Sequence, residues 1–467
     1  MVLGSFTIAE WFVLVQHELL LFAAAFFALG LIDEFALDCS YLWLRLRGRI
    51  RTARLEEGDP NQITHLAGAA AVFIPAWKEA SVIGATVGHM LQVWPQDELR
   101  IYVGCYRNDP ETMASVVAAA RGDTRVRLVV HGRDGPTSKA DCLNRLHQAL
   151  GEDEYRSGTK ARMVVLHDAE DMVDPAALAV LDQALWHADF VQLPVLALPQ
   201  HGSRLVGSHY CDEFAESHAK ALVVRDALGA AIPGAGVGCA IARASLDKLA
   251  IRQGGKPFAE ESLTEDYELG LKIVEAGGRG RFLRIRGADN RLIATRAFFP
   301  ARLDASVRQK TRWMHGIALQ GWDRLGWGKQ PVDLWMQLRD RRGPLAAILL
   351  VMAYGLVALS AIGLGLEQLG LVDPPPPTPL LKALLVINMA GLAMRFAVRA
   401  VFTAREHGWR QGLLAIPRTF VSNIIAIMAG RRALAAYVGT LRGAPIIWDK
   451  TEHRDHPALA IPREEPA

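Results

Sequence analysis

The sequence predicts an α/β domain flanked by transmembrane helices, and two observations point to this fold class. Apolar residues are concentrated at the two ends of the 467-residue chain, in stretches long enough to cross a bilayer. Residues 45–342, between these ends, alternate short β-branched segments with helical patterns, as in a sheet covered by helices. A chain that is 51% hydrophobic and 22% charged fits a membrane-attached globular protein better than a disordered one.

Charge and cysteine content exclude two further classes. The 52 Lys and Arg residues nearly balance the 49 Asp and Glu residues, which leaves a net charge of only +3. We therefore expect no nucleic-acid partner, because a polyanion binder carries a basic field over much of its surface. The five cysteines are widely separated and form no CxxC pair, so we expect a reducing compartment and neither a disulfide framework nor a thiolate zinc site.

Three segments are predicted to span a membrane. Residues 345–366 are 22 residues without a charge, about 33 Å as a helix, which exceeds a hydrocarbon core of about 30 Å. Residues 380–402 can return across the membrane if Lys382, Arg395 and Arg399 snorkel or face protein. Residues 11–32, within an N-terminal segment 1–44, form the remaining span. A cleaved signal peptide is not expected there, since it would begin with a basic region.

Basic residues predict the orientation of these spans. Arginines follow the first span from Arg45 to Arg54, precede the second at Arg339 to Arg342, and follow the third at Arg395 to Arg405. The connection between the second and third spans contains Glu367 and Asp373 but no Lys or Arg before Lys382. The positive-inside rule therefore puts residues 45–342 in the cytoplasm and the connection outside.

The region after the third span is interpreted differently. Residues 413–430 are apolar, but Pro417 and Arg418 interrupt them and basic residues flank both sides. An interfacial amphipathic helix within residues 405–440 satisfies these flanking charges better than a fourth crossing. Residues 441–467 are rich in charge and proline, so we expect a cytoplasmic tail without a core of its own.

Within residues 45–342, the sequence predicts four strands and the helices between them. The strands are expected at residues 70–74, 100–104, 127–130 and 163–166, and the helices at about 81–93, 111–120 and 140–150. Ligands of open α/β sheets bind outside the carboxyl ends of the strands. The residues that follow each strand are therefore the candidates for a functional site.

The fourth predicted strand ends in a cluster of acids. His167 is followed by Asp168, Ala169, Glu170 and Asp171, and carboxylates crowded in this way repel one another unless a cation or protons neutralise them. Hard oxygen ligands at this spacing suit Mg²⁺ or Mn²⁺ carrying a phosphorylated substrate. The alternative is a solvated helix N-terminus, with Asp171 or Asp174 as its cap.

Two later clusters point to the same chemistry. Glu265 and Asp266 follow Thr264, a candidate N-cap, although an ordinary acidic first turn would look alike. Gln309, Arg312 and Trp313 fall on one face of a helix that leads toward the second span. For these three, the alternative is a membrane-surface helix with a snorkelling arginine and an interfacial tryptophan.

The order of these clusters resembles the membrane-bound family 2 glycosyltransferases, whose nucleotide-diphospho-sugar-binding domain has the GT-A fold, a Rossmann-like mixed sheet. Five motifs carry the resemblance, in the family's order: Pro75 to Glu79, Lys139 to Asn144, Asp168 to Glu170, Thr264 to Asp266, and Gln309 to Trp313. The resemblance covers about residues 65–330 and, with the flanking spans, nearly the whole chain.

The resemblance implies an inverting, metal-dependent glycosyltransferase with Asp266 as general base, and with Asp168 and Glu170 as ligands of Mg²⁺ or Mn²⁺. Asp171 is the alternative second ligand. The family's two aspartates after the second strand are replaced by Gly104 to Asp109, which leaves Asp109 as the candidate there. The implied substrate-binding residues are Pro75, Glu79, Asp109, Lys139, Glu265, Gln309, Arg312 and Trp313.

The resemblance also implies partners and a location. The expected donor is a nucleotide sugar, with UDP as its nucleotide, and the acceptor is a growing glycan or a lipid-linked one. The enzyme would sit among the lipids of a bacterial inner membrane and contribute to exopolysaccharide, for which an outer-membrane export partner is compatible. Two alternatives stay open: transfer of a single sugar to a lipid phosphate carrier, and a catalytically silent membrane scaffold or phage-entry component.

Overall fold

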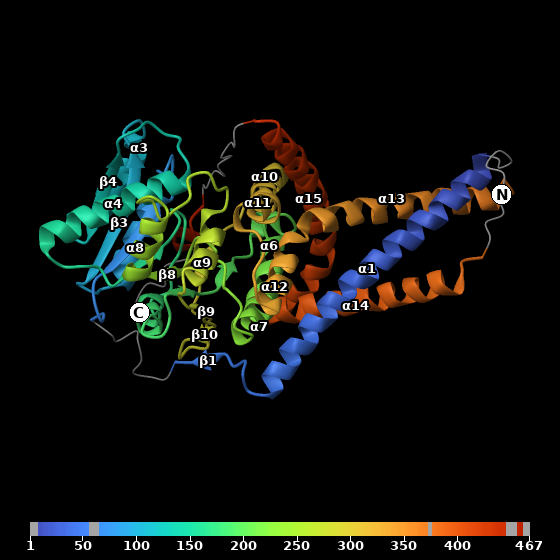
Figure 1. Cartoon of the computed structure of the whole chain (residues 1–467), viewed down its shortest axis with the longest axis horizontal. Coiled ribbons are helices and arrows are strands. Elements are labelled where there is room, and N and C mark those ends of the chain that lie inside the picture. The colour runs from blue at the N-terminus through green and yellow to red at the C-terminus, as the bar shows by residue number, and fades with distance from the viewer. Residues whose placement is uncertain (1–7, 56–64, 372–375, 445–454, 461–467) are drawn as a thin grey trace.

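The computed structural model describes residues 8–55, 65–371, 376–444 and 455–460. Asp373 in the predicted exported connection, and most of the predicted tail, lie outside these ranges. An α/β domain occupies one end of the molecule, three long helices project from the other, and shorter helices lie between them (Figure 1). The predicted α/β fold class with flanking membrane-length helices is confirmed.

A seven-stranded mixed sheet forms the centre of the domain, in the order β4-β3-β2-β5-β8-β6-β9. The first four strands of this order are parallel, and β8 runs antiparallel to both β5 and β6. The bounds are β2 Ala70–Pro75, β3 Leu99–Tyr106, β4 Val126–His131, β5 Met163–Leu166, β6 Phe190–Gln192, β8 Cys239–Ala242 and β9 Gly280–Phe282. All four strands predicted from the sequence are present.

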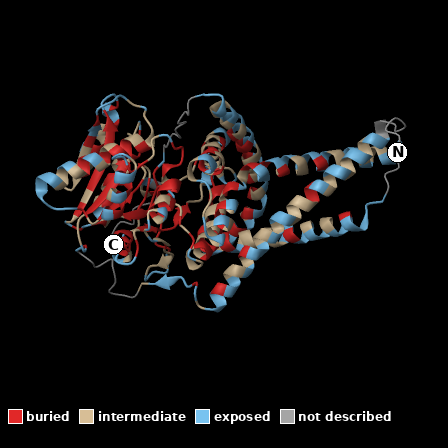
Figure 2. Ribbon diagram, in the orientation of Figure 1, coloured by how far each residue is buried: buried red, intermediate tan, exposed pale blue. Residues whose placement is uncertain are grey.

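Both faces of the central strands β2 and β5 are buried, which explains why these two strands are continuously apolar. In β2, Val72 and Ile74 pack into the cluster that includes α2 (Ile83–Val93) and α5 (Ala177–Ala184). Phe73, between them, faces the opposite cluster with α4 (Lys139–Ser157), α8 (Arg243–Arg252) and α9 (Glu265–Glu275). Alternate residues of the strand therefore pack against helices on opposite faces of the sheet. The sheet is the buried centre of the domain (Figure 2).

Two small parallel pairs complete the β-structure. β7 (Val195–Ala197) pairs with β11 (Thr295–Ala297), and β1 (Ala53–Arg54) pairs with β10 (Ile285–Arg286). A bridge between Met172 and Arg296 joins β11 to the connection that follows β5. Further helices of the domain, and of the region between it and the projecting helices, are α3 Pro110–Ala120, α6 His209–Glu216, α7 Leu222–Ala227, α10 Leu303–Trp313, α11 Gly321–Leu325 and α12 Pro331–Arg341.

Four described helices are long and apolar enough to cross a membrane: α1 Ile8–Leu46, α13 Gly343–Gln368, α14 Pro379–His407 and α15 Trp409–Leu441. The first three project together away from the domain and leave much of their surface exposed (Figures 1 and 2). α15 instead runs across their inner ends, beside α10. In its most apolar stretch, 33% of the residues are buried, against 11–17% in the other three helices. Its interfacial position remains a prediction.

Two arginines of the long helices pair with acidic side chains of other helices. Arg395 of α14 lies 2.6 Å from Glu216 of α6 and 3.3 Å from Glu34 of α1. Its side chain therefore faces protein, as the sequence analysis allowed. Arg418 of α15 is fully buried and pairs with the equally buried Asp212 of α6 at 3.1 Å. These pairs fasten the long helices to the helices that approach the functional site.

Candidate active site

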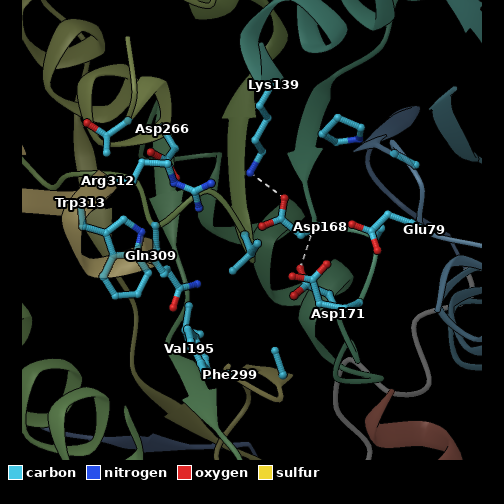
Figure 3. Close-up of a pocket in the computed structure, with 18 of the residues that line it drawn as sticks. Glu79, Lys139, Asp168, Asp171, Val195, Asp266, Phe299, Gln309, Arg312 and Trp313 are labelled. Atoms are coloured by element: carbon cyan, nitrogen blue, oxygen red, sulfur yellow. Dashed lines mark hydrogen bonds and ion pairs between the residues drawn. The ribbon is translucent and has the colours of Figure 1, made fainter. Parts of the chain in front are cut away.

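A cavity opens where β2 and β5 end and where α4 and α9 begin (Figure 3). Ten of the eleven residues proposed from the sequence line it: Pro75, Glu79, Lys139, Asp168, Glu170, Glu265, Asp266, Gln309, Arg312 and Trp313. They come from segments separated by more than 200 positions in the chain. Asp109 is not among the residues that line the cavity.

Lys139, the first residue of α4, connects the two acidic sides of the cavity. Its Nζ lies 2.6 Å from Asp168 Oδ1 (Figure 3). Burial alone would lower the pKa of Lys139, but the negative charges of Asp168, Glu265 and Asp266 raise it above its ordinary value. The lysine is therefore charged throughout the physiological range.

Asp171 shapes the connection that carries the other acids. Its side chain is 2% exposed, and its Oδ2 accepts a hydrogen bond from the Asp168 amide at 2.9 Å. The same oxygen lies 2.9 Å from His167 Nδ1. Burial raises the pKa of Asp171, against the opposing effect of the His167 contact. This carboxylate is thus committed to the backbone and to His167, and Asp168 and Glu170 stay the predicted pair for a cation. Asp174, the other candidate cap, accepts from the Ala176 amide.

The donor set of the cavity fits a divalent cation. Six carboxylates line it, from Glu79, Asp168, Glu170, Asp171, Glu265 and Asp266, against the two cations Lys139 and Arg312. The buried Glu265 Oε1 has no hydrogen-bond partner among the described atoms. Within the described ranges, no three His, Cys, Asp or Glu side chains already converge on one metal position. Asp168 and Glu170 would thus supply part of a coordination shell that substrate oxygens and water complete, as is usual for Mg²⁺.

On the opposite side, the start of α9 departs from the predicted cap. Thr264 occupies the N-cap position, but its hydroxyl makes no capping hydrogen bond. The Thr264 amide instead donates to Ser262 Oγ at 3.2 Å, and Ser262 donates to Glu268 Oε1 at 2.7 Å. The Thr264 side chain packs against Gly316, where a Cβ would approach it to 2.6 Å. Thr264 is therefore the N-cap residue by position, as predicted, but its side chain packs against Gly316 and does not cap the helix.

Asp266 is held close to a glycine-rich segment, residues 233–238, that the sequence analysis missed. A Cβ added to Gly236 would lie 2.2 Å from Asp266 Oδ2 and 3.3 Å from Lys139 Nζ. The backbone φ of Gly236 is +78°, which also favours glycine. The segment's glycines at alternate positions before a short strand were the sequence feature that could have identified it as part of the site. Only a residue without a side chain lets the backbone pass between these two charged groups.

The carboxyls at the start of α9 have raised pKa values. Burial raises the pKa of Asp266, while Lys139 acts in the opposite direction. Burial and the neighbouring Asp266 together raise the pKa of Glu265 to about 7. A carboxylate with a raised pKa is a stronger base than an exposed one, so this pair is suited to accept a proton near neutral pH.

Aromatic side chains form another wall of the cavity. Trp313, at the end of α10, packs edge-on against Tyr210 at 5.9 Å and against Phe214 and Phe299 at 6.4 Å between ring centroids. Phe214 also lines the cavity, as do Phe299 and Val195 (labelled in Figure 3), and none of the three was anticipated from the sequence. Apolar residues carry no chemical signature of a site. Only the folded structure brings them to Trp313.

The ends of β2 and β3 bring a second aromatic pair to the cavity. Trp77 and Tyr106 both line it, with ring centroids 5.1 Å apart in an edge-to-face arrangement. Asp109, predicted to contact the nucleotide here, is buried behind them as the N-cap of α3. It accepts from the Lys78 amide at 2.6 Å and thereby supports the turn that presents Glu79.

Comparisons with known proteins agree with this geometry. Residues 67–316 match the model described as "Glycosyltransferase like family 2". The chain is 30% identical to bacteriophage adsorption protein B of Escherichia coli K12 and to bacteriophage N4 adsorption protein B of Escherichia coli O157:H7. Each alignment covers 97% of this chain and 63% of the relative, so the chain spans less than two thirds of their length.

A solved structure shares the fold. It is a mannosyltransferase from Pyrobaculum calidifontis, determined in complex with GDP-Man and Mn²⁺. The two chains are 18% identical and superimpose with a TM-score of 0.52 over 88% of this chain and 99% of the other. This likeness extends the match beyond the α/β domain into the long helices, since the domain alone is a smaller share of the chain.

Proposed function

The chain belongs to glycosyltransferase family 2, and from this premise we propose that it is an inverting, metal-dependent enzyme that transfers a sugar from a nucleoside diphosphate, UDP, to a glycan acceptor. One observation carries the proposal. Lys139 lies 2.6 Å from Asp168, one of the two acids suited to bind a cation. It also lies near the buried carboxyl of Asp266, which is suited to act as base. An active site for this reaction needs these two functions on opposite sides of one substrate.

The donor side consists of Asp168, Glu170, Lys139 and Arg312. A divalent cation bound there would neutralise the charge that develops on the departing diphosphate. Lys139 and Arg312 would bind the diphosphate oxygens, and Arg312 offers the planar fork that suits phosphate. Glu79 and Pro75 line the cavity on this donor side. We assign the base of the nucleotide to Trp77 and Tyr106, whose rings line the cavity at the ends of neighbouring strands.

The acceptor side consists of Asp266, Gln309 and Trp313. Asp266 would accept the proton of the attacking hydroxyl, a step that contributes typically 10² to 10⁴-fold to such reactions. Because inversion requires attack from the face opposite the leaving group, the base and the diphosphate site must lie apart. Trp313 would form a platform for the acceptor sugar, and Gln309 and Glu265 would complete its surroundings.

We further propose the location. α1, α13 and α14 would span a bacterial inner membrane, with residues 45–342 in the cytoplasm, where nucleotide sugars are made. α15 would lie along the cytoplasmic surface, since it runs across the ends of the other three and buries more of its length. The described tail residues 455–460 would then also be cytoplasmic.

The proposed product is an exopolysaccharide, extended one sugar at a time and exported with an outer-membrane partner. Two relatives are named for phage adsorption, which takes place at the cell surface. A lipid phosphate carrier is the second candidate acceptor. It is favoured by α10, which carries Arg312 and Trp313 and packs directly on α15 beside the projecting helices.

A screen of the full chain purified in detergent tests this proposal. Release of the nucleoside diphosphate is measured for each member of a panel of nucleotide sugars with Mg²⁺ or Mn²⁺, and the product is sized. Release with one donor and a lengthening glycan supports the proposal, while a single glycolipid supports the carrier. Absence of release from every donor, with Mn²⁺ and membrane extract present, would favour the silent scaffold.

A further inference from the structure

The connection that carries Asp168 and Glu170 contains almost no regular structure. Among the described residues, the only ladder contact between the end of β5 at Leu166 and the start of α5 at Ala177 is the bridge of Met172 to Arg296. Buried backbone carbonyls outside helices and strands need other donors. What supplies those donors decides how rigidly the two carboxylates are held.

Four carbonyls of this connection accept hydrogen bonds from side chains. Three donors come from α2 or from the residue that follows it. Thr86 Oγ1 donates to Ala169 O at 2.5 Å, His89 Nε2 lies 2.9 Å from Val173 O, and Trp94 Nε1 donates to Asp174 O at 3.1 Å. The fourth partner is His456, 285 residues farther along the chain, whose Nε2 lies 3.3 Å from Asp171 O.

The surroundings of His456 fix its role as a donor. Its Nδ1 accepts a hydrogen bond from the Ala458 amide at 3.1 Å, so in the neutral ring the proton is on Nε2. The residue is only 1% exposed. The short helix that follows, α16 (Pro457–Ala460), packs on α2. Figure 3 shows this helix, in the red of the C-terminal end, below Asp171.

Asp171 connects His456 to Asp168, a predicted metal ligand. Its carbonyl is held by His456, and its carboxylate accepts the Asp168 amide at 2.9 Å. We propose that His456 is a positioning residue that makes metal binding at Asp168 and Glu170 depend on docking of the carboxy-terminal segment 455–460. The inference rests on the proposed function, because it assumes a cation at these two carboxylates.

The position of segment 455–460 would couple metal binding to the long helices. The chain reaches residues 455–460 after α15, which packs on α10, α13 and α14. The docked segment therefore links the helix that contacts the membrane-length helices to the metal-binding connection. Release of the segment would leave Asp171 O without its donor and would loosen the backbone on which Asp168 and Glu170 stand.

Mn²⁺ binding provides a test that does not depend on turnover. The full chain is purified in detergent and titrated with Mn²⁺ in the presence of UDP, with free Mn²⁺ followed by electron paramagnetic resonance. His456→Leu, which removes the donor at similar bulk, should weaken Mn²⁺ binding about fivefold, while His456→Gln, which keeps an N–H near the Nε2 position, should stay within about twofold of wild type. The matched control His65→Leu changes an exposed histidine of the same domain and should have no effect.

The outcomes separate the inference from the proposed function. If His456→Leu binds Mn²⁺ as wild type does, or if Leu and Gln weaken binding equally, His456 does not act through its hydrogen bond and the inference is overturned. Should the leucine variant fail to fold, the decision passes to Gln against Asn, whose shorter side chain leaves Asp171 O without a donor. Asp168→Asn is titrated alongside. Undiminished Mn²⁺ binding there overturns the metal assignment itself.

Discussion

Lys139 Nζ, at the start of α4, lies 2.6 Å from Asp168 Oδ1, just after β5, and the same ammonium group faces Asp266 across Gly236. One lysine thus contacts the proposed metal side and faces the proposed base. Binding of a diphosphate and a cation would replace part of this ion pair, since both partners would then have stronger contacts. In the free enzyme, this ion pair would hold both side chains in place until the substrates bind.

The first prediction concerns the metal. Asp168→Asn should abolish metal-dependent turnover without unfolding the protein, because the Asp168 side chain is 34% exposed at a strand end and contributes little to the core. Turnover with Mn²⁺ and thermal unfolding are measured together. Asp304→Asn, an exposed acid on α10, is the matched control and should behave as wild type. Wild-type activity in Asp168→Asn, or activity that survives excess EDTA, would rule out the assignment.

The second prediction concerns pH. Asp266 must be deprotonated to act as base, and burial raises its pKa, so kcat/KM should fall as the pH drops, with a midpoint above the ordinary Asp range near 4. Lys139 lowers the pKa of Asp266. Lys139→Met should therefore move the midpoint to higher pH, besides reducing the rate. A midpoint that stays in place or moves to lower pH in this variant would contradict the assignment of Asp266 as the titrating base.

The third prediction concerns the diphosphate. Arg312→Ala should weaken UDP binding and slow transfer together, each by at least about tenfold, because it removes a charge-assisted contact to phosphate. Calorimetry with UDP and a transfer assay on the same preparation provide the two readouts. Arg308→Ala is the control, since Arg308 lies one turn earlier on α10 and pairs with Asp304 at 3.1 Å. An equal effect of both variants would mean that Arg312 acts through helix stability.

The fourth prediction concerns topology. A reporter that is active only in the periplasm should be silent when fused after Arg54 or Arg405, and active when fused between residues 373 and 377. A reporter fused after Arg442, beyond α15, should also be silent if α15 lies on the membrane surface. Activity after Arg442, with the reporters after Arg54 and Arg405 silent, would make α15 a fourth span. Activity after Arg54 would place the domain outside the cytoplasm, where it would not meet nucleotide sugars.

Much of the fold could be predicted because its information is local. β2 and β5 are apolar along their whole length and are soon followed by charged residues, so the pattern of each strand was visible without its neighbours. The residues after these two strands also include part of the site, namely Glu79, Asp168 and Glu170. The charged residues Lys139, Asp266 and Arg312 come from helices. By contrast, β6 and β9 have three residues each, too few for a periodic signal, and exist because they pair with distant partners.

The unpredicted parts of the site have two causes. Phe214 and Phe299 are apolar and far apart in the sequence, so nothing in their chemistry sets them apart from core residues. Asp109 was predicted to contact the nucleotide because it follows a strand, as a ligand-binding residue would. In the structure it is not among the residues that line the cavity. The next residue, Pro110, was the overlooked signal, since Asp before Pro at the first helical position is a typical N-cap.

The measurement that tests the account most directly compares UDP binding with sugar transfer in Asp266→Asn. If Asp266 only removes the acceptor proton, UDP affinity measured by calorimetry should stay near wild type while kcat falls by about 100-fold or more, because the lost interaction matters only in the transition state. Loss of UDP binding as complete as in Asp168→Asn would contradict the account. Asp266 would then belong to the donor site, and the base would have to be sought elsewhere, with Glu265 as the next candidate.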